Sequence, residues 1–186
     1  EIEVRGPQHD LHSGTYGGLV HNPAQALVEI LAKLHDDQGH ITVPGFYDRV
    51  VVPDAGERAE LAKTPIQEDQ LRRETGVPQS WGEAGFALHE RAGIRPTLEI
   101  NGLVSGWTGE GAKTVLPARA LAKVSCRLVP EQDAVEIYEL IREYVRALTP
   151  PTVTSEVRLV HHGRWAVVDI QSPEMQAALH AYEFGF

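Results

Sequence analysis

Cysteine is almost absent from this sequence of 186 residues, in which Cys126 stands alone. A single cysteine excludes an intrachain disulfide and favours the reducing cytoplasm over a secreted, disulfide-stabilised scaffold. No apolar run approaches the roughly 18 residues that a membrane-spanning helix needs, and the N-terminus lacks the basic-then-apolar pattern of a signal peptide. We therefore expect a soluble cytoplasmic protein with no membrane partner.

Positive charge is also scarce, because 17 lysines and arginines face 26 aspartates and glutamates, which gives a formal charge of −9. A nucleic-acid-binding surface is basic, so this balance excludes nucleic acid as the expected partner. The remaining composition, with 42% hydrophobic and 23% charged residues, is that of an ordinary globular domain. The chain begins at Glu1 without a methionine and is strand-like from its second residue, so we expect a piece of a longer chain.

Hydrophobic periodicity predicts a mixture of strands and helices. Ile2 and Val4 alternate with charged residues, as in a half-buried strand. Asn22 and Pro23 predict the start of a helix that continues to a stop at Gly39. A second helix is predicted over 133–148 and a third from 172, and further strands over 97–103, 119–129 and 153–161.

The stretch 40–95 is less regular and is predicted to be an insertion, in which Thr64 and Gln67 form a capping box and Gly76 ends a helix. Without it, the order is strand, helix, strand, strand, helix, strand. This order predicts an α+β fold of the ferredoxin-like split βαβ type, a four-stranded antiparallel sheet with two helices on one face. The predicted domain spans 1–164, and 165–186 leads toward a neighbouring domain.

Local motifs give weak functional signals. The glycine-rich segment 106–114 lacks a lysine directly after its last glycine and is followed by a strand, so it does not predict a phosphate loop. It is either a plain hairpin connection or a loop that closes over a ligand with Lys113 or Thr114. The nine histidines lack the paired spacing of a zinc site, and no metal ligand is predicted. Asp10, His12 and Ser13 are too close in sequence to converge as a nucleophilic set, and no nucleophile elbow surrounds Ser13.

Two residues each allow two interpretations. On the strand 119–129 the apolar row is even-numbered, so Arg127 faces away from it. Arg127 is either a solvated charge or the base of a concave ligand surface, where a guanidinium suits a carboxylate. His12 is either a solvated loop histidine or part of a site.

Three motifs, taken together, resemble a known family. They are DLHSGTYGG at Asp10–Gly18, GEGAKTVLP at Gly109–Pro117 and SCRLVP at Ser125–Pro130. Their order and spacing resemble the lid domain of the di-zinc exopeptidases, which include carnosine-type dipeptidases, acetylornithine deacetylases, aminoacylases and succinyl-diaminopimelate desuccinylases. The long insertion is most similar to the dipeptidase branch.

The resemblance implies a zinc-dependent metallopeptidase that hydrolyses short peptides or N-acyl amino acids. In it, this lid forms a homodimer and is joined to a catalytic domain of the same chain, toward which 165–186 returns. His12 matches the histidine that enters the partner's active site and polarises the scissile carbonyl. Arg127 matches the arginine that binds the substrate's terminal carboxylate, and Thr114 matches a lid threonine close to it. His161 matches a later substrate-contacting histidine, although the adjacent His162 could be the equivalent.

The same resemblance places both zinc ions outside these residues. No His-x-Asp motif followed by a Glu-Glu pair occurs in the sequence, so we expect these 186 residues alone to be inactive. The alternative from another functional class is a free-standing ferredoxin-like module that serves binding or assembly without catalysis.

Overall fold

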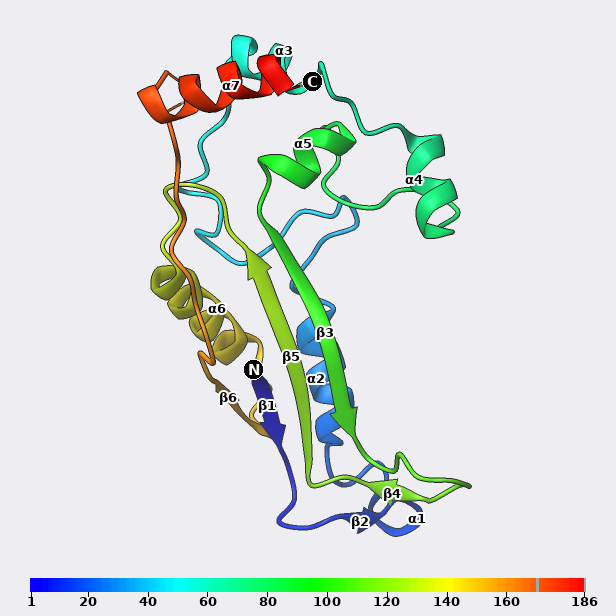
Figure 1. Ribbon diagram of the computed structural model, residues 1–186. Helices are drawn as coiled ribbons and strands as arrows, with labels where there is room; N and C mark the ends of the chain where they lie inside the picture. Colours follow the sequence, from blue (N-terminus) through cyan, green and yellow to red (C-terminus); the bar gives the residue numbers. More distant parts are fainter. Residues whose placement is uncertain (170, 186) are drawn as a thin grey trace.

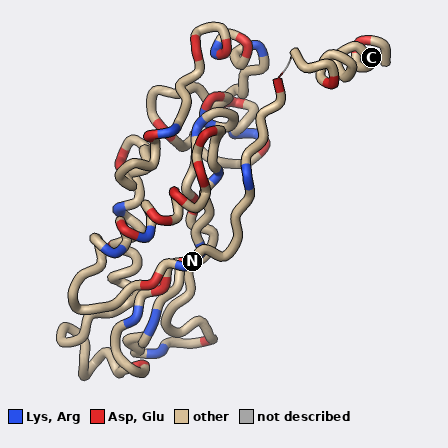
Figure 2. Tube along the Cα trace, turned by 90° about the vertical axis from the view of Figure 1, so that its left-hand side faces the viewer, with Lys and Arg blue, Asp and Glu red and all other residues tan. Residues whose placement is uncertain are grey.

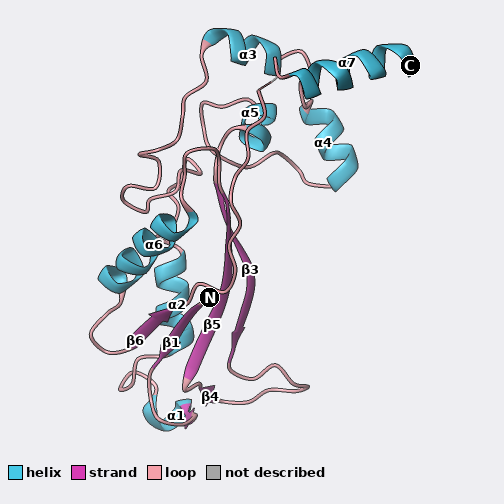
Figure 3. Ribbon diagram, turned by 60° about the vertical axis from the view of Figure 1, so that its left-hand side comes forward, coloured by secondary structure: helices cyan, strands magenta, loops and turns pink. Residues whose placement is uncertain are grey.

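The computed structural model describes residues 1–169 and 171–185 (Figure 1). Its main sheet is antiparallel, in the order β3-β5-β1-β6, and consists of β1 (Ile2–Arg5), β3 (Thr97–Ser105), β5 (Arg119–Arg127) and β6 (Thr154–Val157). Helices α2 (Pro23–Leu31) and α6 (Ala134–Leu148) cover one face of it (Figure 3). The predicted α+β class and the four-stranded antiparallel sheet are confirmed.

The remaining elements lie at the two ends of this sheet (Figure 1). At one end, β2 (Leu11–His12) pairs with β4 (Val115–Leu116), next to the short helix α1 (Ser13–Tyr16). The other end carries the helices of the insertion, α3 (Ala55–Leu61), α4 (Glu68–Thr75) and α5 (Leu88–Gly93), together with α7 (Pro173–Gly185).

The core lies between the sheet and helices α2 and α6. Ile2 and Val4 are buried in it, as their alternation predicts. Glu3 lies on the opposite face, where its carboxylate contacts Arg5 at 2.8 Å and Arg158 at 3.2 Å. Both helices contribute to the same apolar cluster, through Ala26, Leu27, Ile30 and Leu31 of α2 and Ile137, Ile141 and Val145 of α6.

Helix α2 begins as predicted but ends early. The Asn22 side chain accepts a hydrogen bond from the Ala24 N–H, and Pro23 occupies the first turn. The predicted end at Gly39 is wrong, because α2 ends at Leu31. Beyond it the backbone tightens into turns, and the Asp36 carboxylate accepts hydrogen bonds from two backbone N–H groups, those of residues 38 and 40, at 2.9 Å each.

Helix α6 and strand β6 also follow the predicted positions, with one correction. The Asp133 carboxylate accepts hydrogen bonds from the first N–H groups of α6, which hold the pKa of Asp133 below its ordinary value. The last strand is shorter than the predicted 153–161, because β6 spans only Thr154–Val157. Its partner in the sheet is β1, and the pairing runs only from Arg5↔Thr154 to Ile2↔Val157.

The predicted insertion is in part a continuation of the core. Ile41, Val43 and Phe46 fall within 40–95, yet they are 3%, 2% and 0% exposed and belong to the main cluster. Within the insertion, the predicted Thr64–Gln67 capping box is absent. Helix α4 starts only at Glu68, and Gln67 makes no side-chain cap hydrogen bond. The predicted end of α4 is confirmed, since Gly76 adopts the left-handed conformation, with φ of 76°.

A buried ion pair anchors the end of the insertion. The Arg95 guanidinium donates two hydrogen bonds of 2.7 Å to the Glu83 carboxylate and stacks on the rings of Tyr47 and Phe86. Burial alone would raise the pKa of Glu83, but hydrogen bonds from Arg95 and His40 outweigh it and hold the pKa below its ordinary value. No periodic pattern predicts this cluster.

Charged residues of both signs are interspersed in the view of Figure 2. On α6 they pair one helical turn apart, as Glu139 with Arg142 and Glu143 with Arg146. In the part of the chain that the structure describes, no helix is long and apolar enough to cross a membrane.

Candidate functional site

The sequence-predicted residues His12 and Thr114 meet at the end of the sheet. Strands β2 and β4 pair in the register Leu11↔Leu116 and His12↔Val115. The Ser13 N–H donates to the Thr114 carbonyl oxygen at 3.1 Å. These backbone contacts bring the His12 ring to Thr114, so that Nε2 lies 3.1 Å from Oγ1 although the two residues are 102 positions apart.

The backbone fixes which ring nitrogen of His12 carries a proton. The Gly14 N–H donates to Nδ1 at 3.0 Å, and a backbone N–H can only donate. In the neutral imidazole, Nε2 therefore carries the hydrogen and donates to Thr114 Oγ1. A Cβ on Gly14 would lie only 2.7 Å from Cε1 of the ring, so this arrangement requires glycine at position 14.

This end of the sheet contains no catalytic triad. The Asp10 carboxylate accepts a hydrogen bond of 2.8 Å from the Ala118 N–H and thus joins the two loops. In this structure its hydrogen bond goes to Ala118 and not to His12. His12 and Thr114 are both exposed, so the side chains of this pair are accessible to another molecule.

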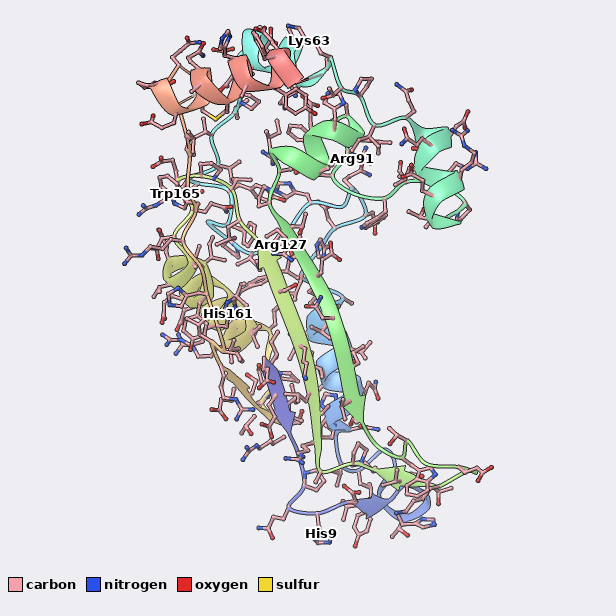
Figure 4. All side chains as sticks on the ribbon, viewed as in Figure 1. His9, Lys63, Arg91, Arg127, His161 and Trp165 are labelled. Carbon is pink, nitrogen blue, oxygen red and sulfur yellow. The ribbon has the colours of Figure 1, made fainter. Side chains whose placement is uncertain are left out.

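Arg127 lies at the far end of β5 from His12. Figure 4 shows Arg127 at that end and His9, three residues before His12, at the other. Strand β5 is nine residues long, which corresponds to roughly 25 Å. A small substrate therefore cannot contact both residues of one chain. The same separation applies to Thr114, which contacts His12 and is remote from the Arg127 of its own chain.

Arg127 and His161 line one cavity of about 740 Å³, together with His162 and several basic residues, Lys123, Arg158 and Arg164. Arg127 is exposed, as strand alternation predicts, and within residues 1–169 and 171–185 its side chain makes no ion pair or hydrogen bond. Its guanidinium is thus free for an anionic ligand. His161 and His162 both follow the end of β6, so strand alternation does not distinguish them.

The same cavity contains Cys126, whose thiol is not a nucleophile at neutral pH. Burial raises the pKa of Cys126 to about 12, so almost none of it is thiolate. The described residues also contain no group of three or more His, Cys, Asp or Glu side chains that could hold a metal ion. The residues present therefore do not fit a zinc pair, and no metal step is assigned to them.

Sequence reasoning missed the roles of two residues that shape the His12 end. One is Asp10, which was considered only for catalysis and whose bond to Ala118 has no local signal. The other is Trp107, which contacts its own glycine-rich loop through Glu110 and Lys113. The only available signal for Trp107 was an aromatic residue within a run of glycines.

Comparisons with known proteins identify the family of this chain. The model of the peptidase dimerisation domain of the M20 peptidases matches residues 1–153. The Cys-Gly metallodipeptidase of Schizosaccharomyces pombe is 32% identical over 169 residues, which cover 88% of this chain and 35% of that protein. The human Beta-Ala-His dipeptidase is 31% identical over 144 residues, which cover 77% of this chain and 28% of that protein.

Comparison with solved structures identifies similar proteins of the same kind, namely dipeptidases. Human carnosine dipeptidase 1 superimposes with a TM-score of 0.82 and 28% identity, covering 100% of this chain and 40% of that one. The dipeptidase Dug1p of Saccharomyces cerevisiae gives a TM-score of 0.81 and 29% identity, covering 98% and 39%. The chain thus spans well under half the length of these relatives. It belongs to the M20 peptidase dimerisation domain family, among the Cys-Gly and carnosine dipeptidase-like members.

Proposed function

We propose that this dimerisation domain serves a dipeptidase-like metallopeptidase that hydrolyses short peptides or N-acyl amino acids, and that it contributes residues to two active sites. His12 and Thr114 act in the active site of the partner subunit. Arg127 and His161 bind substrate in the subunit to which they belong. The zinc ions expected from the family resemblance are bound by a catalytic part of the protein outside these 186 residues, toward which 165–186 leads.

The main support for this proposal is the distance between the two ends of β5. His12 and Thr114 form a hydrogen-bonded pair at one end of β5, while Arg127 lies unpaired at the other. A dipeptide is far shorter than the roughly 25 Å between these ends. If all four residues serve one substrate, two of them must come from a second subunit, which is consistent with a domain that mediates dimerisation.

The domain fits a split βαβ unit of the ferredoxin-like type that pairs with a second copy through its edge strand β3. Strand β3 is at the edge of the sheet, and Leu103 and Val104 on it are 55% and 59% exposed. Neighbouring residues of a strand face opposite sides, so apolar surface is available on both faces of this edge. A two-fold dimer through such an edge continues the sheet from one subunit into the other.

The chemistry proposed for His12 follows from its protonation. Its Nε2–H, oriented by the Gly14 N–H on the other ring nitrogen, donates to Thr114 Oγ1 in this structure and passes from there to the substrate oxygen when the partner's site is occupied. Amide hydrolysis develops negative charge on the carbonyl oxygen, and a fixed donor at that oxygen stabilises the transition state. Arg127 suits the terminal carboxylate, which a guanidinium binds through two parallel hydrogen bonds.

The test is subunit exchange between two inactive variants of the complete protein, His12→Ala and a metal-ligand variant. His12→Ala alone should lower kcat by about 10²–10³, the usual loss for one such donor, with unchanged metal content. In a mixed dimer, the subunit with an intact metal site receives His12 from its partner. Activity should therefore return to about a quarter of wild type at statistical exchange, since half of the dimers are mixed and each has one working site.

His9→Ala is the matched control, because His9 is an exposed histidine of the same loop. It should leave activity unchanged in homodimers. If mass measurements confirm exchange between the two inactive variants and no activity returns, His12 does not act across the dimer and the proposal is wrong.

A further inference from the structure

We propose that Trp107 is a positioning residue for the His12–Thr114 pair. It organises the glycine-rich loop 106–114 so that Thr114 is held against His12. This inference rests on the proposed function, because it gives Trp107 a part in delivering those two side chains to the partner's active site.

The loop is built around the Trp107 ring. The indole Nε1–H donates to the Glu110 carbonyl oxygen at 3.2 Å, and the Lys113 ammonium lies 5.1 Å from the ring centroid, within the range of a cation–π interaction. Gly109 lies against the ring so closely that a Cβ there would be 2.5 Å from it. Three positions of the loop thus contact one side chain.

Gly109 is the informative glycine in this loop. Its φ is not among the positive values, whereas those of Gly106 and Gly111 are 66° and 79°. A side chain at position 109 would therefore displace the ring of Trp107 from its present position, although the backbone conformation there would allow one. The close contact indicates that ring and loop are fitted to each other, although the ring is 49% exposed and outside the core.

The last residue of the loop 106–114 is Thr114, which itself contacts His12. Lys113 is adjacent to Thr114, and its carbonyl oxygen accepts a hydrogen bond of 2.9 Å from the Val115 N–H. The Thr114 carbonyl oxygen accepts from Ser13, and its hydroxyl accepts from His12. Displacement of Lys113 thus moves Thr114 and removes its support from His12. A loop with three glycines has many alternative conformations, and the ring contacts restrict them.

The experiment measures kcat of the complete dimeric protein. Trp107→Ala should lower kcat by about ten- to a hundredfold, the scale of a displacement of about 1 Å at a catalytic group. Trp107→Phe keeps a ring beside Gly109 and under Lys113 and loses only the hydrogen bond to Glu110, so it should retain activity within about threefold. Gly109→Ala retains the indole but pushes it out of its present position, so it should lower kcat in the same direction as Trp107→Ala. The control is Trp81→Ala, since Trp81 is 72% exposed in the insertion, and it should leave kcat unchanged.

The double variant His12→Ala/Trp107→Ala separates positioning from general structure. If Trp107 acts through His12 and Thr114, the loss in the double variant should be smaller than the product of the two single losses. Losses that multiply, or no rescue by Trp107→Phe, would overturn the inference, as would Trp107→Ala with wild-type kcat. These outcomes differ from failure of the proposed function, in which His12→Ala itself retains full activity.

Discussion

Replacement of Arg127 by lysine tests whether this end of β5 binds a carboxylate. Arg127 is exposed and its side chain makes no ion pair or hydrogen bond within the described residues, so its substitution breaks no internal polar contact. Exposed substitutions of this kind change the free energy of unfolding by less than about 0.5 kcal/mol. Any larger effect of Arg127→Lys on the complete protein must therefore arise in ligand binding.

The expected magnitude follows from the geometry of the two side chains. Lysine retains the charge but loses the planar fork that binds both carboxylate oxygens. The loss of one charged hydrogen bond corresponds to about 1–3 kcal/mol. At about 1.4 kcal/mol for each factor of ten, Arg127→Lys should raise KM by about five- to a hundredfold for substrates with a free terminal carboxylate, with a smaller effect on kcat.

Steady-state kinetics with a dipeptide and its C-terminally amidated analogue provide the assay. The amidated substrate lacks the carboxylate, so its KM should be almost insensitive to the substitution. Arg119→Lys is the matched control, because Arg119 lies on the same face of β5 at its other end. Equal increases in KM for both substrates, or the same increase from Arg119→Lys, would show that Arg127 does not recognise the carboxylate.

Two further predictions concern the domain itself. Burial raises the pKa of Cys126 to about 12. Its alkylation by iodoacetamide at pH 8 should therefore be roughly a hundredfold or more slower in the folded domain than in urea. Equal rates would contradict the burial of this thiol. Phe46→Ala should lower the free energy of unfolding by about 3–5 kcal/mol in urea titrations, because Phe46 is 0% exposed. The control is Val52→Ala, at a 70% exposed position, which should change the free energy of unfolding by less than about 0.5 kcal/mol. A similarly small change for Phe46→Ala would place position 46 outside the core.

The sequence predicts those elements whose signals are local and periodic. Helix α6 has an apolar stripe and an aspartate cap, and the structure contains it from the residue after that cap, Asp133. The predicted end of α2 fails because Leu34 continues the helical period while the chain has already turned at Leu31. Leu34 is nevertheless 0% exposed, so the period identified a core residue but not its conformation.

Buried residues within the stretch 40–95 could not be predicted from local sequence patterns. Its irregular pattern suggested a segment separate from the core, yet Phe46 is fully buried there. A single buried residue in a loop has no period, so only the folded arrangement identifies it. The same holds for Arg95, whose partner Glu83 and stacking ring Phe86 come from turns whose sequence predicts no contact.

The candidate site depends on the register of the core sheet. Arg5 of β1 pairs with Arg119 of β5, and the chain leaves both strands at that point. Leu11 lies six residues after Arg5, and Leu116 three residues before Arg119, so the register of the long strands brings β2 and β4 together. A pair of two-residue strands has no periodicity to detect, which explains why the contact between residues 12 and 114 escaped prediction. A one-residue slip between β1 and β5 would turn every side chain of β1 to the other face, so the buried apolar row fixes this register and with it the position of His12.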